Sequence, residues 1–284
     1  MRKRSILLTS ALASLALLSA CGNNSGENNT QSATNDSLIT SLPLSMNIKS
    51  AEKSYKITSN DPEFTCYLTI STSVQWPEAI SDYDIKPLQD TILTLMYPDV
   101  KDPHDVNSAI TQFVSDAKSL ELGDEISEVD TVPQFSIDNQ VYYAKCQLQM
   151  MEISDELVTL SITRSQYMGG AHPMTLSIPF TYDFDNSEII SFGWLFKDGA
   201  DENLVPVLKE AIATQLNMTV RDLDDSLLSD FKVSDLVYIP NGHIVFHYNP
   251  YEILPYSFGA IDAVIYPSEI TDILTPQAVT LLKD

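Results

Sequence analysis

The segment from Leu157 to Tyr182 constrains the fold of this chain more than any other. It consists of two stretches of alternating apolar and polar residues on either side of Gly169-Gly170-Ala171-His172-Pro173, a pattern that predicts two half-buried strands. The Gly-Gly pair permits positive φ angles, and Pro173 restricts the backbone where the second strand begins. We therefore expect an irregular connection with a polar tip inside an otherwise regular sheet.

Hairpins account for most of the remaining pattern. Turn residues separate short alternating stretches, and Asn241-Gly242 is the strongest hairpin signal in the chain. The pattern predicts further strands at residues 63–75, 141–153, 188–191, 236–240, 243–248 and 261–266.

Apolar residues spaced three and four apart predict helices between these strands. One runs from Asp84 to about Met96, and a second begins at Asp102-Pro103 with Asp102 as its cap. A third passes through Leu204 and Leu216, with an open start because Pro206 suits only a first turn. The two other expected segments are an acidic connection at 123–134 and a short helix that ends before Pro276.

Because strands outnumber helices and arrive as hairpins, the expected class is α+β. We expect antiparallel sheets built of hairpins, three or four helices and two related subdomains.

The first twenty residues have the organisation of a secretion signal. Three basic residues precede an apolar run that is too short for a permanent membrane span. Leu18-Ser19-Ala20-Cys21 resembles the lipobox of bacterial lipoproteins, which implies cleavage before Cys21 and acylation of that residue. Ordinary secretion, with Cys21 as a chance cysteine, is the alternative.

We therefore expect residues 1–20 to be the signal peptide. Residues 21–47, rich in Asn, Ser, Thr and Gly over most of their length, are expected to form a flexible tether. The expected location is extracytoplasmic and lipid-anchored. Gly22 stands where enteric bacteria place an inner-membrane retention aspartate, which favours the outer membrane.

The formal net charge of −23 argues against nucleic acid as a partner. It favours either a basic protein partner, which charge would steer to the surface, or simply a secreted protein kept soluble. Beyond Cys21 the only cysteines are Cys66 and Cys146, both expected to point inward from strands. A disulfide between them and two buried free thiols are both compatible with the sequence.

The segments 167–173, 193–196 and 246–259 together resemble the RsiV-type extracytoplasmic domain family, which also forms the N-terminal region of peptidoglycan deacetylases of the PdaC type. The motifs that carry this resemblance are Tyr-x-Gly-Gly-Ala-His and Pro-Tyr-Glu-x-x-Pro-Tyr. It implies a PdaC-like subdomain at 48–166 and an RsiV-like subdomain at 167–284. It also suggests lysozyme as the basic partner, without the signalling or deacetylase chemistry of those proteins.

Six residues are candidates for binding within these motifs: Gly169, Gly170, His172, Tyr251, Glu252 and Tyr256. His172 is expected to hold the Gly-Gly connection through a backbone hydrogen bond, with a ligand contact or a metal ligand as the alternative. Glu252 could shape a turn or join a pocket. Tyr251 and Tyr256 are expected to act as stacking or interface anchors.

No catalytic motif occurs in the sequence. His243 and His247 lie about 13 Å apart on a strand, which is too far for shared metal coordination. We therefore expect a cell-envelope binding protein with no catalytic residue, metal or cofactor. The alternatives are a peptidoglycan- or glycan-binding module and an uncharacterised hydrolase.

Overall fold

A computed structural model describes residues 6–7, 44–58, 65–117, 125–134 and 140–283. Cys21, nearly all of the expected signal peptide and most of the expected tether lie outside the described residues. Ile6 and Leu7 form β1, which pairs with the end of β5 at Ile153 and Glu152.

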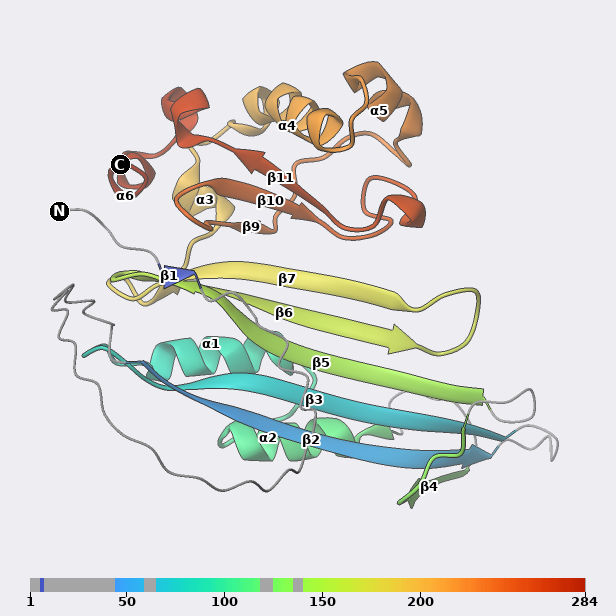
Figure 1. The fold of residues 1–284 in the computed structure, drawn as a ribbon. Coiled ribbons are helices and arrows are strands. Elements are labelled where there is room, and N and C mark those ends of the chain that lie inside the picture. Colours follow the sequence, from blue (N-terminus) through green and yellow to red (C-terminus); the bar gives the residue numbers. More distant parts are fainter. Residues whose placement is uncertain (1–5, 8–43, 59–64, 118–124, 135–139, 284) are drawn as a thin grey trace, which may run out of the picture.

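A large mixed sheet forms the N-terminal lobe, residues 44–189, in the strand order β4-β2-β3-β5-β6-β7-β8 (Figure 1). Its strands are β2 (Leu44–Thr58), β3 (Thr65–Ile80), β4 (Glu125–Val129), β5 (Gln140–Ile153), β6 (Leu157–Tyr167), β7 (Met174–Asp183) and β8 (Glu188–Ile189). The α+β class is confirmed, but the expectation of antiparallel sheets alone is wrong because β3 and β5 pair in parallel. Parallel neighbours need a long crossover, and the chain between them contains two helices.

These helices, α1 (Lys86–Met96) and α2 (Val106–Ser115), cover one face of the sheet. The prediction of α1 is confirmed, whereas the predicted start of α2 at Asp102 is wrong. Asp105 is the cap: its carboxylate accepts from the backbone N–H groups of Asn107 and Ser108 at 2.7 and 2.9 Å. The Ser108 hydroxyl is paired with the backbone N–H of Asp105, which completes a capping box.

Two strands of this lobe were not expected from the sequence. β2 begins at Leu44, so the last four residues of the expected tether belong to a strand that pairs with β3 along its whole length. β4 lies where the sequence suggested only an acidic connection, and it pairs with Ser54–Thr58 of β2. In both cases the ladder of backbone hydrogen bonds forms despite a weak apolar pattern, because tertiary pairing overrides local propensity.

The C-terminal lobe, residues 190–283, has a smaller antiparallel sheet in the order β11-β10-β9. Its elements are α3 (Phe192–Leu195), α4 (Asp201–Gln215), α5 (Val220–Ser226), β9 (Val237–Tyr238), β10 (Ile244–Tyr248), β11 (Ile261–Ile265) and α6 (Pro276–Leu281), with short 3₁₀ turns at 256–258, 267–269 and 271–273. The predicted Asn-Gly hairpin is confirmed, with φ of 50° at Asn241 and 73° at Gly242.

Two helix predictions in this lobe need correction. Pro206 lies inside α4, beyond the first turn, so this proline does not mark the start of the helix. Pro276 begins α6, although the sequence suggested a helix that ended before it. Thr275 caps this helix by accepting from the backbone N–H of Ala278, and proline suits the first helical position.

Separate sets of buried residues form the cores of the two lobes. One cluster runs from Ile190 to Ala278, while the others lie between Tyr55 and Phe184. The boundary expected between residues 166 and 167 falls in the β6–β7 hairpin of the large sheet. That domain division stays a prediction, since a boundary concerns which part folds independently.

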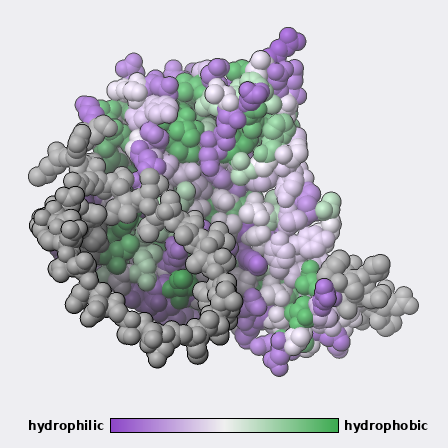
Figure 2. Space-filling view, in the orientation of Figure 1, coloured by the Kyte–Doolittle hydropathy of each residue, from purple (hydrophilic) through white to green (hydrophobic). Residues whose placement is uncertain are grey.

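The C-terminal lobe lies over β6 and β7 (Figure 1). The hydroxyls of Thr159 and Thr181, both buried, lie 2.9 Å apart on adjacent strands. Thr181 accepts from the backbone N–H of Ile239 at 2.8 Å, and Thr159 donates to its carbonyl at 3.1 Å. Further along, Glu152 accepts from the backbone N–H of Asn241 at 2.7 Å. Figure 2 shows this view of the surface as mostly polar, with apolar residues gathered over the C-terminal lobe.

Cys66 and Cys146 are free and buried, so the disulfide alternative is wrong. In the register of β3 and β5, Cys146 lies opposite Thr72, six residues along β3 from Cys66. That offset corresponds to about 20 Å, far beyond the reach of a disulfide.

We predict that a Cys21→Ser variant shows two reactive thiols in denaturant without any reductant. In the native protein both should react slowly, since burial raises the pKa of Cys66 and raises that of Cys146 to about 11 and so lowers the thiolate fraction. Colorimetric thiol titration measures both states. A requirement for reductant before any thiol reacts in denaturant would contradict this assignment.

For α2, Asp105→Ala should lower the free energy of unfolding by about 1 kcal/mol through loss of the cap. Asp102→Gly removes a carboxylate three residues earlier, where φ is 43°, and should change stability by only a few tenths of a kcal/mol. Urea denaturation of both variants tests the corrected helix start. Equal losses in the two variants would refute it.

Candidate functional site

Two loops that are distant in the sequence meet at one end of the molecule. One is the Gly-Gly loop, residues 168–173, between β6 and β7; the other is the tyrosine loop, residues 249–258, between β10 and β11. Tyr256 joins them by donating a hydrogen bond from its hydroxyl to the carbonyl of Pro173 at 2.9 Å. Five of the six candidate binding residues lie at this junction, and Glu252 lies in the turn beside it.

The two glycines have the conformation that the sequence predicted. Gly169 and Gly170 have φ angles of 93° and 94°, a region that L side chains rarely adopt. A Cβ atom on Gly169 would also lie 3.4 Å from the hydroxyl oxygen of Tyr142. Tyr167 donates to the carbonyl of Gly170 at 3.0 Å. Tyr167 therefore holds the connection, and Tyr142 limits the space beside Gly169.

His172 stacks on Tyr256, with ring centroids 3.7 Å apart and an angle of 16° between the planes. Its Nε2 lies 3.1 Å from the hydroxyl of Tyr251, and its Nδ1 lies 3.0 Å from the carbonyl oxygen of Pro173. The contact between Nδ1 and the Pro173 carbonyl is a backbone hydrogen bond of the kind expected for a structural role of His172. The same ring also forms part of a partly exposed surface, which we call the aromatic platform: His172, Tyr251 and Tyr256.

Tyr251 has the least favourable backbone in this platform. Its φ is 70°, although it carries a bulky side chain, and its residue surface is 47% exposed. Such a conformation costs about 1–3 kcal/mol and persists only where the surroundings impose it. Its ring centroid lies 5.6 Å from that of Tyr256. The tyrosine loop thus holds an exposed ring in a strained position.

Glu252 shapes the turn that produces this strain. Its carboxylate accepts from the backbone N–H of Asn249 at 2.8 Å, and its own N–H donates to the Asn249 carbonyl at 3.1 Å. These contacts support the interpretation that Glu252 shapes a turn, over the alternative that it joins a pocket.

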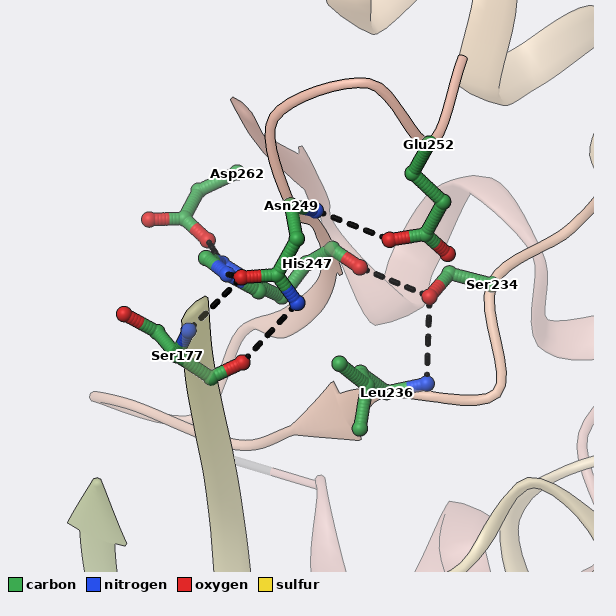
Figure 3. Close-up of polar contacts among 7 residues, drawn as sticks. All are labelled: Ser177, Ser234, Leu236, His247, Asn249, Glu252 and Asp262. Carbon is green, nitrogen blue, oxygen red and sulfur yellow. Dashed lines mark hydrogen bonds and ion pairs between the residues drawn. The ribbon is translucent and has the colours of Figure 1, made fainter. Parts of the chain in front are cut away.

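Asn249 fixes the tyrosine loop to the N-terminal lobe. Its Oδ1 accepts from the backbone N–H of Ser177 at 2.6 Å, and its Nδ2 donates to the Ser177 carbonyl at 3.0 Å (Figure 3). One side-chain amide therefore makes both hydrogen bonds that a neighbouring strand would make with this residue of β7. Sequence analysis did not identify Asn249, although its position directly after β10 and before Pro250 could have marked it as a turn residue.

His247 supports Asn249 from within the C-terminal lobe. It is 5% exposed, its Nδ1 lies 2.7 Å from Oδ1 of Asp262, and its Nε2 lies 3.3 Å from Oδ1 of Asn249. The backbone of His247 is held as well, because its carbonyl accepts from the Ser234 hydroxyl at 2.6 Å. Burial, reinforced by Asp262, raises the pKa of the nearby Tyr238.

The site presents one exposed ring, that of Tyr251, beside two half-buried rings, those of His172 and Tyr256. Among the described residues, no group of three or more His, Cys, Asp or Glu could hold a metal ion. Cavities of about 620 and 650 Å³ lie elsewhere among the described residues, and the linings of both leave out the aromatic platform. Over the same part of the chain, no helix has the length and apolar character needed to cross a membrane. Partly exposed histidine and tyrosine rings are suited to stacking and interface contacts.

Comparison with known proteins gives a family match for part of the chain and a similar fold. Residues 195–266 match the family described as protein of unknown function, DUF3298, which includes RsiV-like and PdaC-like domains. A DUF3298 family protein from Bacteroides fragilis NCTC 9343 is 17% identical with a TM-score of 0.59, over 86% of this chain and 99% of that one. Another, from Pseudomonas aeruginosa PAO1, is 17% identical with a TM-score of 0.56, over 84% and 96%. No curated protein matches the chain.

We predict that Asn249→Ala lowers the free energy of unfolding by about 1–3 kcal/mol, because it leaves two half-buried backbone groups of Ser177 without partners. It should also disperse the aromatic platform, which NMR would detect as lost ring-to-ring contacts between His172 and Tyr256. Asn203→Ala, at an exposed position of α4, is the matched control and should change neither quantity appreciably. Intact ring contacts in Asn249→Ala would show that Asn249 does not position the platform.

Proposed function

We propose that this chain, whose residues 195–266 match the DUF3298 family, is a non-catalytic binding protein of the bacterial cell envelope. It is anchored by a lipid on Cys21 and binds a basic protein through the aromatic platform. The resemblance to RsiV-type domains makes lysozyme the first partner to test.

The conformation of Tyr251 carries the binding part of this proposal. A buried tyrosine with positive φ would be explained by packing, but Tyr251 is 47% exposed. Backbone strain concentrates at functional sites, where it serves to hold a group in place. Tyrosine is also among the residues that dominate binding energy at interfaces.

The charge of the chain supports a basic partner. With 39 acidic residues against 16 Lys and Arg, the protein would attract a cationic surface and accelerate its encounter. A Lys or Arg of that partner could then lie over the ring of Tyr251, a favourable contact between a cation and an aromatic face.

A glycan is the second candidate, favoured by the exposure of the Tyr251 ring. Sugar rings pack against aromatic faces without any need for opposite charge, so such binding would resist salt. Peptidoglycan is the glycan that the resemblance to PdaC-type domains suggests.

In a binding assay with lysozyme at low salt, Tyr251→Ala should weaken affinity about tenfold or more. Tyr266→Ala is the matched control, since Tyr266 is also on the C-terminal lobe and is 52% exposed; it should change affinity by less than about twofold. Affinity of the unmodified protein should fall at moderate salt as charge is screened. Absence of lysozyme binding at low salt would exclude lysozyme as the partner.

Purified peptidoglycan sacculi distinguish the second candidate. Retention that persists at high salt and is lost in Tyr251→Ala would replace the basic protein with a glycan. Equal retention of Tyr251→Ala and Tyr266→Ala would remove the aromatic platform from either function.

A further inference from the structure

The cavity of about 650 Å³ lies on the helix-covered face of the large sheet, beyond the C-terminal end of α1. Strands β3, β5, β6 and β7 form its floor, and residues 96–101 with the end of α2 form its wall. Its apolar lining includes Ile70, Met96, Phe113, Cys146, Met174 and Leu176. The volume falls within the usual range for small-molecule sites, about 300–1,000 Å³.

The floor remains apolar where α1 and α2 no longer cover it. Leu176 is 40% exposed, although Phe180, further along the same face of β7, is 3% exposed. Met174 continues this row and is half-buried. An alternating strand ordinarily becomes polar on a face that meets water. The persistence of large apolar side chains on this strongly acidic protein therefore indicates a surface that something covers.

Arg164 is the cation of this floor. It lies on β6 directly opposite Cys146 on β5 and Leu176 on β7. Its Nη2 donates to the carbonyls of Leu95 and Met96, at 2.8 and 3.3 Å, at the end of α1. These contacts fix the guanidinium but use only part of its five N–H donors.

No carboxylate neutralises Arg164 among the described residues, because none of their ion pairs includes it. This is unexpected in a chain with 39 acidic residues. A half-buried cation without a counter-charge is costly, and an anion that contacts it is correspondingly favoured. Lys145 also borders the cavity, but its ammonium group lies 5.5 Å from the centre of the Tyr143 ring, and Tyr143 and Lys145 lie on the other face of β5.

The wall limits which anion fits. Two carboxylates, Asp99 and Asp116, line it against one ammonium group, that of Lys101, so a ligand with more than one negative charge would meet net repulsion. One guanidinium with free N–H groups matches one carboxylate, which accepts two parallel hydrogen bonds.

We propose that this cavity binds an amphipathic monocarboxylate, with its hydrocarbon chain against Met174, Leu176 and Phe113 and its carboxylate on Arg164. The site is separate from the aromatic platform in its residues, and its occupancy does not depend on the proposed function.

Isothermal titration of the full chain with decanoate tests the proposal, with decan-1-ol as the uncharged probe of the same chain length. Decanoate should bind more tightly than decan-1-ol. Arg164→Gln, which keeps an amide donor beside α1, should weaken decanoate binding about tenfold or more and leave the affinity for decan-1-ol unchanged. Arg221→Gln, at an exposed position on α5, is the matched control and should bind both probes as the unmodified protein does.

Leu176→Trp gives a second, independent test because it fills the cavity from an exposed position. It should abolish binding of both probes. The proposal is overturned if the unmodified protein does not bind decanoate, if Arg164→Gln binds it equally well, or if Leu176→Trp leaves binding intact.

Discussion

The side-chain amide of Asn249 is the contact on which the arrangement of the candidate site depends. It makes two hydrogen bonds to the backbone of Ser177 on β7, while His247 lies against the same amide oxygen. Since the Ser177 groups fix which end of the amide is oxygen and which is nitrogen, this residue has one orientation. The turn that follows, closed by Glu252, then places Tyr251 and Tyr256 beside His172.

This contact also answers a problem of sheet architecture. β8 pairs only with Tyr182 and Asp183 of β7, so an open edge would otherwise invite pairing with another chain. Pro179 has no N–H group that could pair at that edge, and the backbone N–H of Ser177 is already bonded to the Asn249 side chain. Side chains rather than a further strand thus join the lobes here, as the buried threonines Thr159 and Thr181 do nearer β9. The Gly-Gly loop and the tyrosine loop can meet because the residues of neither loop are paired in a sheet.

Much of the fold was predictable where local pattern and tertiary environment agree. The β5–β6 and β9–β10 hairpins, α1 and the positive φ angles of Gly169 and Gly170 follow from alternation, helical spacing and glycine chemistry. β2 and β4 were missed because pairing with other strands, rather than their own sequences, stabilises them. The site divided in the same way: motifs indicated His172, Tyr251 and Tyr256, but not Asn249 or Arg164. These two residues matter because their side chains form hydrogen bonds with backbone carbonyl or N–H groups that are distant in the sequence.

Amide hydrogen exchange tests the central claim most directly. Ser177 and Thr175 are two residues apart on β7, so their backbone groups face the same edge of the sheet. Among the described residues, the Asn249 side chain bonds to the backbone N–H of Ser177 and not to that of Thr175. The account predicts that the Ser177 amide exchanges much more slowly than the Thr175 amide in the native protein. Equal exchange rates at the two positions would contradict it, because Asn249 would then not hold the C-terminal lobe to this strand.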